Sequence, residues 1–189
     1  MKTRRLFLVA ASICCLAMFA ACGGSKKAST AYLENPCSDC VSTDAAVRAV
    51  AIRESMDQQM AKQMARSSAL EEMASKLSVT VKAVIDDYYS SRSVNMNEEA
   101  KRRFEGMSRQ IIDQTVKGYR TVCEKYTVNT KPNGAEVYKC YYGIELGKED
   151  ISKSLYKGLT NDEKLRLDYD YEKFKEEFNK QLNNFDQNR

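Results

Sequence analysis

The stretch of residues 119–146 has the sequence YRTVCEKYTVNTKPNGAEVYKCYYGIEL, and it decides the fold. Two runs rich in valine, threonine and tyrosine, residue types that favour strands, flank Lys131-Pro132-Asn133-Gly134. Asn-Gly between two such runs is the strongest short signal for a β-hairpin. We therefore predict strands at 119–128 and 136–146, joined by a tight connection.

Cys123 and Cys140 lie on the two arms of this predicted hairpin, and the length of its loop decides whether they can bond. A two-residue Asn-Gly turn would pair Thr127 with Cys140. Cys123 would then lie four residues, or about 13 Å, further along the sheet, which is too far for a disulfide. A six-residue loop over 129–134 would instead set Cys123 opposite Cys140, and a bond would be possible. The sequence leaves both registers open.

A further strand and a long helix are predicted before the hairpin. Residues 45–52 (AAVRAVAI) favour a short strand, and Ser55-Met56-Asp57-Gln58 has the spacing of a capping box. Small alanines at 61, 65, 69 and 74 indicate close packing against a neighbour. Larger apolar residues recur at three- and four-residue steps over 56–88, the period of a helix, and we expect this stripe to fill the core: Met56, Met60, Met64, Leu70, Met73, Leu77, Val81, Val84 and Ile85.

Two further helices are predicted on either side of the hairpin. Asn97 is placed to cap the first, with acidic residues in its first turn, and Gly118 is placed to end it. The last helix is expected to open at Thr160, which has capping-box spacing to Glu163. The predicted fold class is α+β: a small antiparallel β-sheet with a long amphipathic helix and further helices covering one face.

The first 21 residues have the order of a secretory signal: three basic side chains, an apolar run over 6–19, then small residues before Cys22. This pattern resembles the lipobox of bacterial lipoproteins, in which the cysteine thiol receives the lipid; Phe19 stands where leucine is usual. We predict a lipoprotein signal peptide at 1–21, lipidated Cys22 with a flexible tether at 22–40, and one α+β domain with a C-terminal helix at 41–189.

Removal of the predicted signal changes the charge balance of the chain. The full sequence has 30 basic and 26 acidic side chains, and residues 1–21 contain three of the basic ones. The mature chain would therefore have 27 basic and 26 acidic groups. Such a neutral balance gives no argument for a nucleic-acid partner.

The cysteines of the mature domain are the residues most able to form covalent bonds or take part in redox chemistry. Cys37, Cys40, Cys123 and Cys140 remain after processing, and an even number in an oxidising compartment favours disulfides or buried thiols. Cys37 and Cys40 form a C-x-x-C pair, which is either a structural disulfide or a redox couple. A single C-x-x-C predicts no zinc site.

Catalytic groups are sparse in the sequence. The chain contains no histidine, which excludes Ser-His-Asp and Cys-His catalysis and histidine metal sites. It also lacks a glycine-rich phosphate loop. We therefore expect no catalytic residues, no metal and no cofactor, and we expect that the protein is not an enzyme.

Several segments together resemble the LPP-twenty lipoproteins, a family of small bacterial envelope proteins. The resemblance rests on the lipobox, the strand at 47–49, the alanine-rich helix ending at 69–74, the tyrosine-rich strand at 138–146 and the closing stretch 168–174. It covers most of residues 40–180. It implies an α+β fold and an outer-membrane lipid anchor, and it implies no defined reaction. The four domain cysteines are not part of it.

The expected function is that of a non-enzymatic, lipid-anchored envelope lipoprotein that acts in protein interaction or envelope assembly. Its partners would be the membrane, reached through the lipid, and another envelope protein; any small-molecule ligand is unknown. An acidic cluster just after the lipidated cysteine would resemble a surface-export signal. None follows Cys22, so we expect an outer-membrane protein that faces the periplasm. The alternative is a periplasmic thiol-redox protein that uses Cys37 and Cys40.

Overall fold

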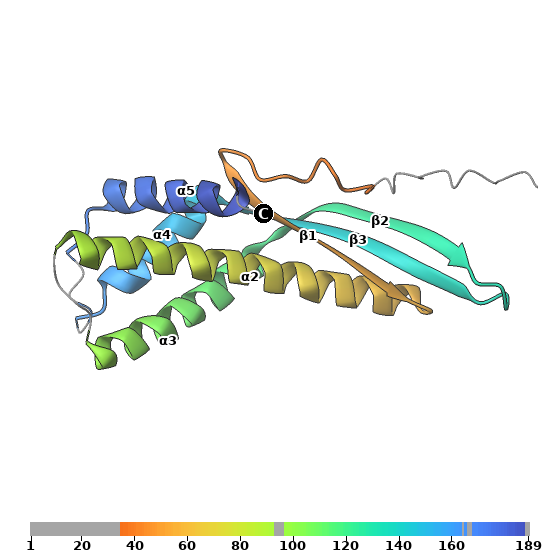
Figure 1. The fold of residues 1–189 in the computed structure, drawn as a ribbon, viewed down its shortest axis with the longest axis horizontal. Helices are drawn as coiled ribbons and strands as arrows, with labels where there is room; N and C mark the ends of the chain where they lie inside the picture. The colour runs from red at the N-terminus through yellow and green to blue at the C-terminus, as the bar shows by residue number, and fades with distance from the viewer. Residues whose placement is uncertain (1–34, 93–96, 164, 166–167, 188–189) are drawn as a thin grey trace, which may run out of the picture. The chain divides into compact units, whose positions relative to one another are not determined.

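The fold is that of a computed structural model, which describes residues 35–92, 97–163, 165 and 168–187 within one compact unit, Glu34–Arg189. The predicted signal peptide and Cys22 lie outside the described residues. The elements follow one another as β1 (Ala46–Ser55), α2 (Gln58–Ser91), α3 (Glu98–Thr115), the 3-10 turn η1 (Val116–Gly118), β2 (Arg120–Thr130), β3 (Glu136–Gly147), α4 (Lys148–Thr160) and α5 (Tyr171–Gln187) (Figure 1).

The three strands form one antiparallel sheet in the order β1-β3-β2, so the C-terminal arm of the hairpin is the central strand. The α2 helix packs against β1 and β3 (Figure 1). The predicted α+β class, with a small antiparallel sheet and a long helix on one face, is confirmed. The further helices α3, α4 and α5 pack mainly on α2 and on one another. None of the described helices is both long enough and apolar enough to cross a membrane.

The hairpin adopts neither of the two registers considered from the sequence. Thr130 pairs with Glu136, which leaves a five-residue loop in which the Lys131 N–H donates to the Ala135 carbonyl (2.8 Å). Within it, the Gly134 N–H donates to the Lys131 carbonyl (2.9 Å), and Gly134 has a φ of 82°, a conformation that glycine adopts without strain. Asn-Gly therefore ends a four-residue turn and does not form a two-residue connection.

Capping of α2 differs by two residues from the prediction. Ser55 is the last residue of β1, and its hydroxyl accepts the Asp57 N–H (3.1 Å). Asp57 is the capping residue, because its carboxylate accepts the Met60 N–H (2.7 Å). At α3 the predicted cap is confirmed: the Asn97 side chain accepts the Ala100 N–H (2.8 Å).

Alanines on the N-terminal half of α2 make the contact with the sheet. Ala61, Ala65 and Ala69 are fully buried, beneath the side of β1 and β3 that carries Val47, Ala49, Ala51, Cys140, Tyr142 and Ile144. The expectation that the first methionines fill the core is wrong, because Met56, Met60 and Met64 are 72%, 49% and 41% exposed. A helix surface lined with alanine can approach a sheet closely, and the neighbouring residues at 60 and 64 are then turned outward.

Larger side chains occupy the C-terminal half of α2, where the neighbours are helices. Residues from Leu77 to Tyr88 share one core with Phe174, Phe178 and Leu182 of α5. On the other pair of helices, Gly158 of α4 leaves room for Ile111 of α3, because a Cβ at residue 158 would overlap the isoleucine side chain. Because α2 contacts the sheet with its N-terminal half and α5 with its C-terminal half, it joins the sheet to the helices.

The predicted start of the last helix at Thr160 is wrong, since Thr160 ends α4 and its hydroxyl donates back to the Tyr156 carbonyl (2.8 Å). The final helix is α5, which begins at Tyr171. The sequence analysis missed α4 altogether, although Ile151, Leu155 and Leu159 recur at four-residue steps and are all buried.

Replacing Ala65 with leucine tests the close contact between helix and sheet. We expect A65L to lower the free energy of unfolding by about 1–3 kcal/mol, because the added side chain overpacks the buried surface. Gln63→Leu is the matched control, since residue 63 is exposed on the same helix. Urea unfolding followed by circular dichroism measures both, and an equal stability of the two variants would contradict this packing.

Candidate functional site

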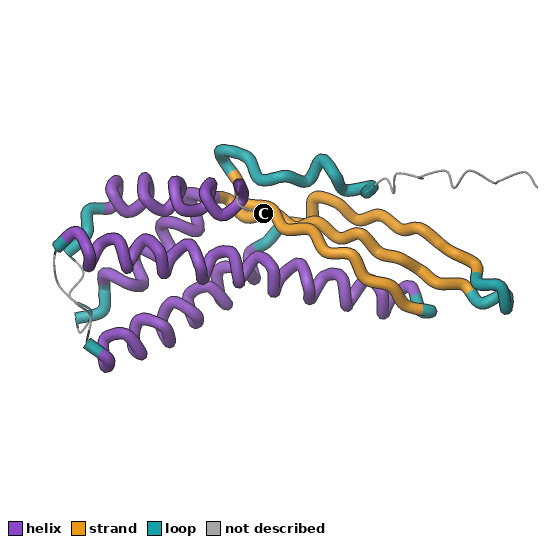
Figure 2. Tube along the Cα trace, viewed as in Figure 1, coloured by secondary structure: helices purple, strands orange, loops and turns teal. Residues whose placement is uncertain are grey.

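Three cysteine sulfurs gather on the side of the sheet that faces away from α2. Cys37 is bonded to Cys123 of β2, with 5.9 Å between their Cα atoms, and Cys40 has a free thiol. The three Sγ atoms all lie within 4.8 Å of one another. Figure 2 shows the N-terminal loop in teal, running beside the orange strands to which the disulfide joins it. Residues 35–40, predicted as flexible tether, thus belong to the compact unit.

Short turns hold Cys37 and Cys40 close together. The Asn35 side chain accepts the Cys37 N–H (3.0 Å), and the Cys40 N–H donates to the Cys37 carbonyl (3.1 Å). The second hydrogen bond closes a four-residue turn over 37–40. The spacing of the C-x-x-C motif therefore brings both side chains to one end of the sheet surface.

Cys123 and Gly143 complete the surroundings of the cluster. The register set by the hairpin loop puts Cys123 opposite Gly143 on the central strand, and the register shift between Cys123 and Thr121 begins just beyond this pair. A Cβ at residue 143 would lie 3.1 Å from Cys123 Cβ and 3.3 Å from Cys40 Sγ, which is tighter than an ordinary contact. Glycine at this position thus leaves room for two of the three cysteines. We call Cys37, Cys40 and Cys123 the sulfur cluster.

Neither of the two cysteine pairings considered from the sequence forms. Cys37 bonds to Cys123 instead of Cys40, and Cys123 lies opposite Gly143, three residues from Cys140. Because successive side chains on a strand alternate between faces, that odd separation puts Cys140 on the opposite side of the sheet. Cys140 is fully buried in the core beneath α2, and this burial raises the pKa of its thiol.

Charges around Cys40 do not favour its thiolate. Partial burial, followed by the Asp39 carboxylate, raises the pKa of the Cys40 thiol, while Arg48 acts in the opposite direction. A redox-active C-x-x-C needs a thiol with a lowered pKa beside an exchangeable partner cysteine. The hypothesis of an oxidoreductase based on a Cys37–Cys40 couple thus stays a prediction that this environment does not favour.

Beside the cluster, a buried carboxylate joins all three strands. Glu145 of β3 accepts hydrogen bonds from Arg48 of β1 (2.6 Å) and from Arg120 of β2. Both arginines stabilise the ionised form, so the pKa of the Glu145 carboxyl is lowered, chiefly by Arg120. Arg48 also holds the N-terminal segment, since its backbone N–H donates to the Ser42 hydroxyl (3.1 Å) and its guanidinium to the Val41 carbonyl (3.2 Å).

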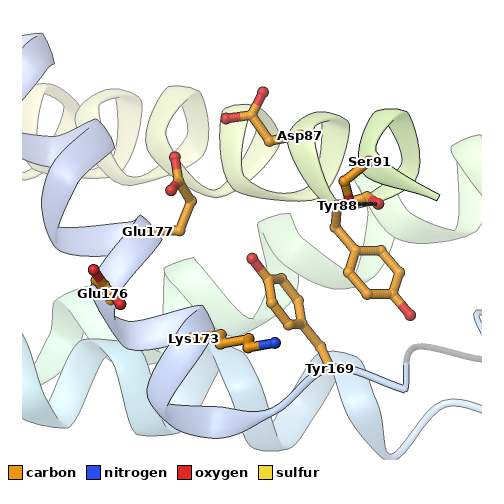
Figure 3. Close-up of a pocket in the computed structure, with 7 residues that line it drawn as sticks. All are labelled: Asp87, Tyr88, Ser91, Tyr169, Lys173, Glu176 and Glu177. Carbon is orange, nitrogen blue, oxygen red and sulfur yellow. Dashed lines mark hydrogen bonds between the residues drawn. The ribbon is translucent and has the colours of Figure 1, made fainter. Parts of the chain in front are cut away.

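A second candidate site is a pocket of about 340 Å³ where α2 ends and α5 begins, and the sequence analysis missed it (Figure 3). Several polar groups in and beside it have partners within the protein. The Tyr88 hydroxyl accepts the Asp168 N–H (3.1 Å), Arg92 donates to the Asp168 carbonyl (2.9 Å), and Gln181 bridges two of the carboxylates. We assign no ligand to it. The pocket is lined by Asp87, Tyr88, Ser91, Tyr169, Lys173, Glu176 and Glu177.

The sulfur cluster is poorly suited to hold a metal ion. In the described part of the chain, it is the one group of three or more cysteine or carboxylate side chains with ligand atoms close enough to share an ion. Two of its three sulfurs are joined in a disulfide, which leaves the Cys40 thiol as a single ligand.

Comparison of the chain with protein-family models, curated proteins and solved structures found no match.

The ion pairs of Glu145 predict a stability that depends on pH. A carboxyl whose pKa is lowered by folding stabilises the native state above its unfolded pKa of about 4.3, and this contribution is lost as the pH falls through the folded value. We expect E145Q to lower the free energy of unfolding by about 1–2 kcal/mol at pH 7.

Urea unfolding between pH 3 and pH 7 measures this difference. The gap between E145Q and the natural protein should narrow as the pH falls below about 4. Glu136→Gln is the control, because Glu136 lies on the same strand and is exposed. A gap that keeps its size down to pH 3 would refute the role given to the ionised carboxylate.

Proposed function

We propose that the chain is a non-enzymatic lipoprotein of the cell envelope, anchored through Cys22 in the outer membrane and facing the periplasm. In this proposal its α+β domain binds another envelope protein or supports envelope assembly. The resemblance to the LPP-twenty lipoproteins implies the outer-membrane lipid anchor. The structural observation on which the proposal rests most is the disulfide between Cys37 and Cys123.

This disulfide supports export of the chain from the cytoplasm. Disulfides form and persist in oxidising compartments and are rare in the cytosol. Cys37 is fully buried and Cys123 is 9% exposed. Their bond is therefore packed within the folded domain and does not join two cysteines that lie on the exposed surface. A domain stabilised in this way suits a compartment such as the periplasm.

The same bond sets the reach of the proposed anchor. Cys37 lies fifteen positions after Cys22, and an extended chain spans at most about 3.6 Å per position. The cluster would therefore lie within about 54 Å of the lipidated residue. A partner bound to the domain would then lie near the membrane surface.

An exposed line of methionines, Met56, Met60 and Met64, is the surface that we propose for the partner; we call it the methionine stripe. Lys62 reaches Glu124 of β2 (2.9 Å), and Arg66 lies over the Tyr119 ring just before β2 (5.6 Å). At 100° per residue, Met60 and Met64 lie on the other flank of α2, along β1, and Met56 comes just before the helix begins. Flexible thioether side chains adapt to apolar partner surfaces, and exposed groups of them mark interaction sites.

Metabolic labelling with palmitate tests the anchor. We expect the natural protein to incorporate label and to fractionate with the outer membrane, and C22A to lose both properties because it lacks the acylated thiol. Cys15→Ala is the matched control, since residue 15 lies inside the predicted signal peptide and would be removed. An unlabelled natural protein, or a C22A variant still bound to the membrane, would end the lipoprotein proposal.

Charge substitutions on the methionine stripe test the partner surface. We expect the double variant Met60→Glu, Met64→Glu to lose its partner when crosslinked complexes are recovered from solubilised membranes, because the carboxylates prevent apolar contact. Its melting temperature should remain within a few degrees of that of the natural protein, since both positions are exposed. Gln63→Glu controls for the added charge. Unchanged recovery by the double variant would show that the stripe is not the binding surface.

A further inference from the structure

The sulfur cluster contains one disulfide and one thiol within reach of it, which is the arrangement that thiol–disulfide exchange requires. Cys40 is partly exposed, whereas Cys37 and Cys123 are buried. All three Sγ atoms lie within 4.8 Å of one another. We propose that the cluster is an exchange site in which Cys40 attacks Cys37, forms a Cys37–Cys40 disulfide and releases the Cys123 thiol.

The step is balanced without an outside oxidant or reductant. Cys40 loses its proton and attacks Cys37 Sγ, so that a Cys40–Cys37 bond forms as the Cys37–Cys123 bond breaks. The electron pair of the broken bond leaves on Cys123 Sγ, which takes up a proton. One disulfide and one thiol are present before and after, as in any exchange of this type.

Attack at Cys37 is favoured over attack at Cys123 by the local backbone. The hydrogen bond from the Cys40 N–H to the Cys37 carbonyl (3.1 Å) holds these residues in one turn, independently of the sheet. The first and fourth Cα atoms of such a turn lie within 7 Å, the separation that a disulfide spans. The product disulfide therefore needs no rearrangement of the strands.

Exchange would release the turn at 35–40 from β2 and leave the following residues in place. Ser42 and Val41 stay bound to Arg48, and the Thr43 N–H donates to the Ala46 carbonyl (2.8 Å). The released turn would expose Cys123 and the buried Tyr141 beside it, and it would present the new Cys37–Cys40 disulfide to solvent. A thiol or dithiol from the same compartment could then reduce this exposed disulfide. Before the exchange, the same reductant has poor access to the buried Cys37–Cys123 bond.

The ionisable groups that face Cys40 act on the pKa of its thiol. They are Asp39 on its own turn, Arg48 on β1 and Glu145 on β3, with the Tyr141 phenol in the same small cluster. Burial and Asp39 raise the pKa of the thiol, so the attacking thiolate is scarce at pH 7. At pH values below the pKa, the amount of thiolate, and hence the rate of exchange, rises about tenfold for each unit by which the pH is raised.

Trapping of the disulfides tests the site directly. The full-length protein is held at pH 7 or pH 9, quenched in acid, denatured, alkylated with N-ethylmaleimide and cleaved with trypsin without reduction. Cys123 then lies in the peptide TVCEK, and Cys37 and Cys40 lie together in another. We expect alkylated TVCEK together with the Cys37–Cys40 disulfide, formed faster at pH 9.

Reduction by glutathione supplies a second readout with matched variants. We expect C40S to lose at least tenfold in the rate at which its disulfide is reduced, because the internal route is gone. Cys140→Ala removes the other free thiol, on the opposite side of the sheet, and should keep the natural rate. Equal rates in C40S and the natural protein, with TVCEK found only in its bond to Cys37, would overturn the proposal; neither readout depends on the lipid anchor.

Discussion

The contact of the alanine surface of α2 with β1 and β3 is the interaction on which the rest of the structure depends. At 34 residues the helix is about 51 Å long, and its N-terminal half covers the sheet while its C-terminal half supports the other helices. Ala61, Ala65 and Ala69 have no exposed surface. Because the helix lies so close to the strands, residues on its flanks are turned away from the sheet, and the methionine stripe is the result.

Much of the fold could be predicted from the sequence because its signals are local. The hairpin, the strand before the long helix, the long helix itself and the Asn97 cap each follow from residues that lie next to one another in the chain. The side of α2 that is buried could not be predicted in the same way. Methionine and alanine recur with the same period on that helix, and only the close approach of β1 and β3 decides that the smaller residues face inward.

The pairing of the cysteines was beyond local reasoning, because it depends on the length of the hairpin loop and on where residues 35–40 lie against β2. The five-residue loop puts Cys123 opposite Gly143. Either loop length considered from the sequence gives a different neighbour. The contribution of residues 35–40 was also missed, since a polar segment containing proline gives no periodic signal. The signal that was present is Gly143, whose lack of a side chain makes space for Cys40 and Cys123.

The disulfide also determines how mechanical tension would enter the domain. The N-terminal segment leads directly into β1, an outer strand of the sheet, and a pull on that strand alone could separate it from β3 one hydrogen-bonded pair at a time. The covalent bond at Cys37 meets the pull first and transfers it to β2, on the opposite edge. Tension would therefore enter the sheet at β2 and would not separate β1 from β3 pair by pair.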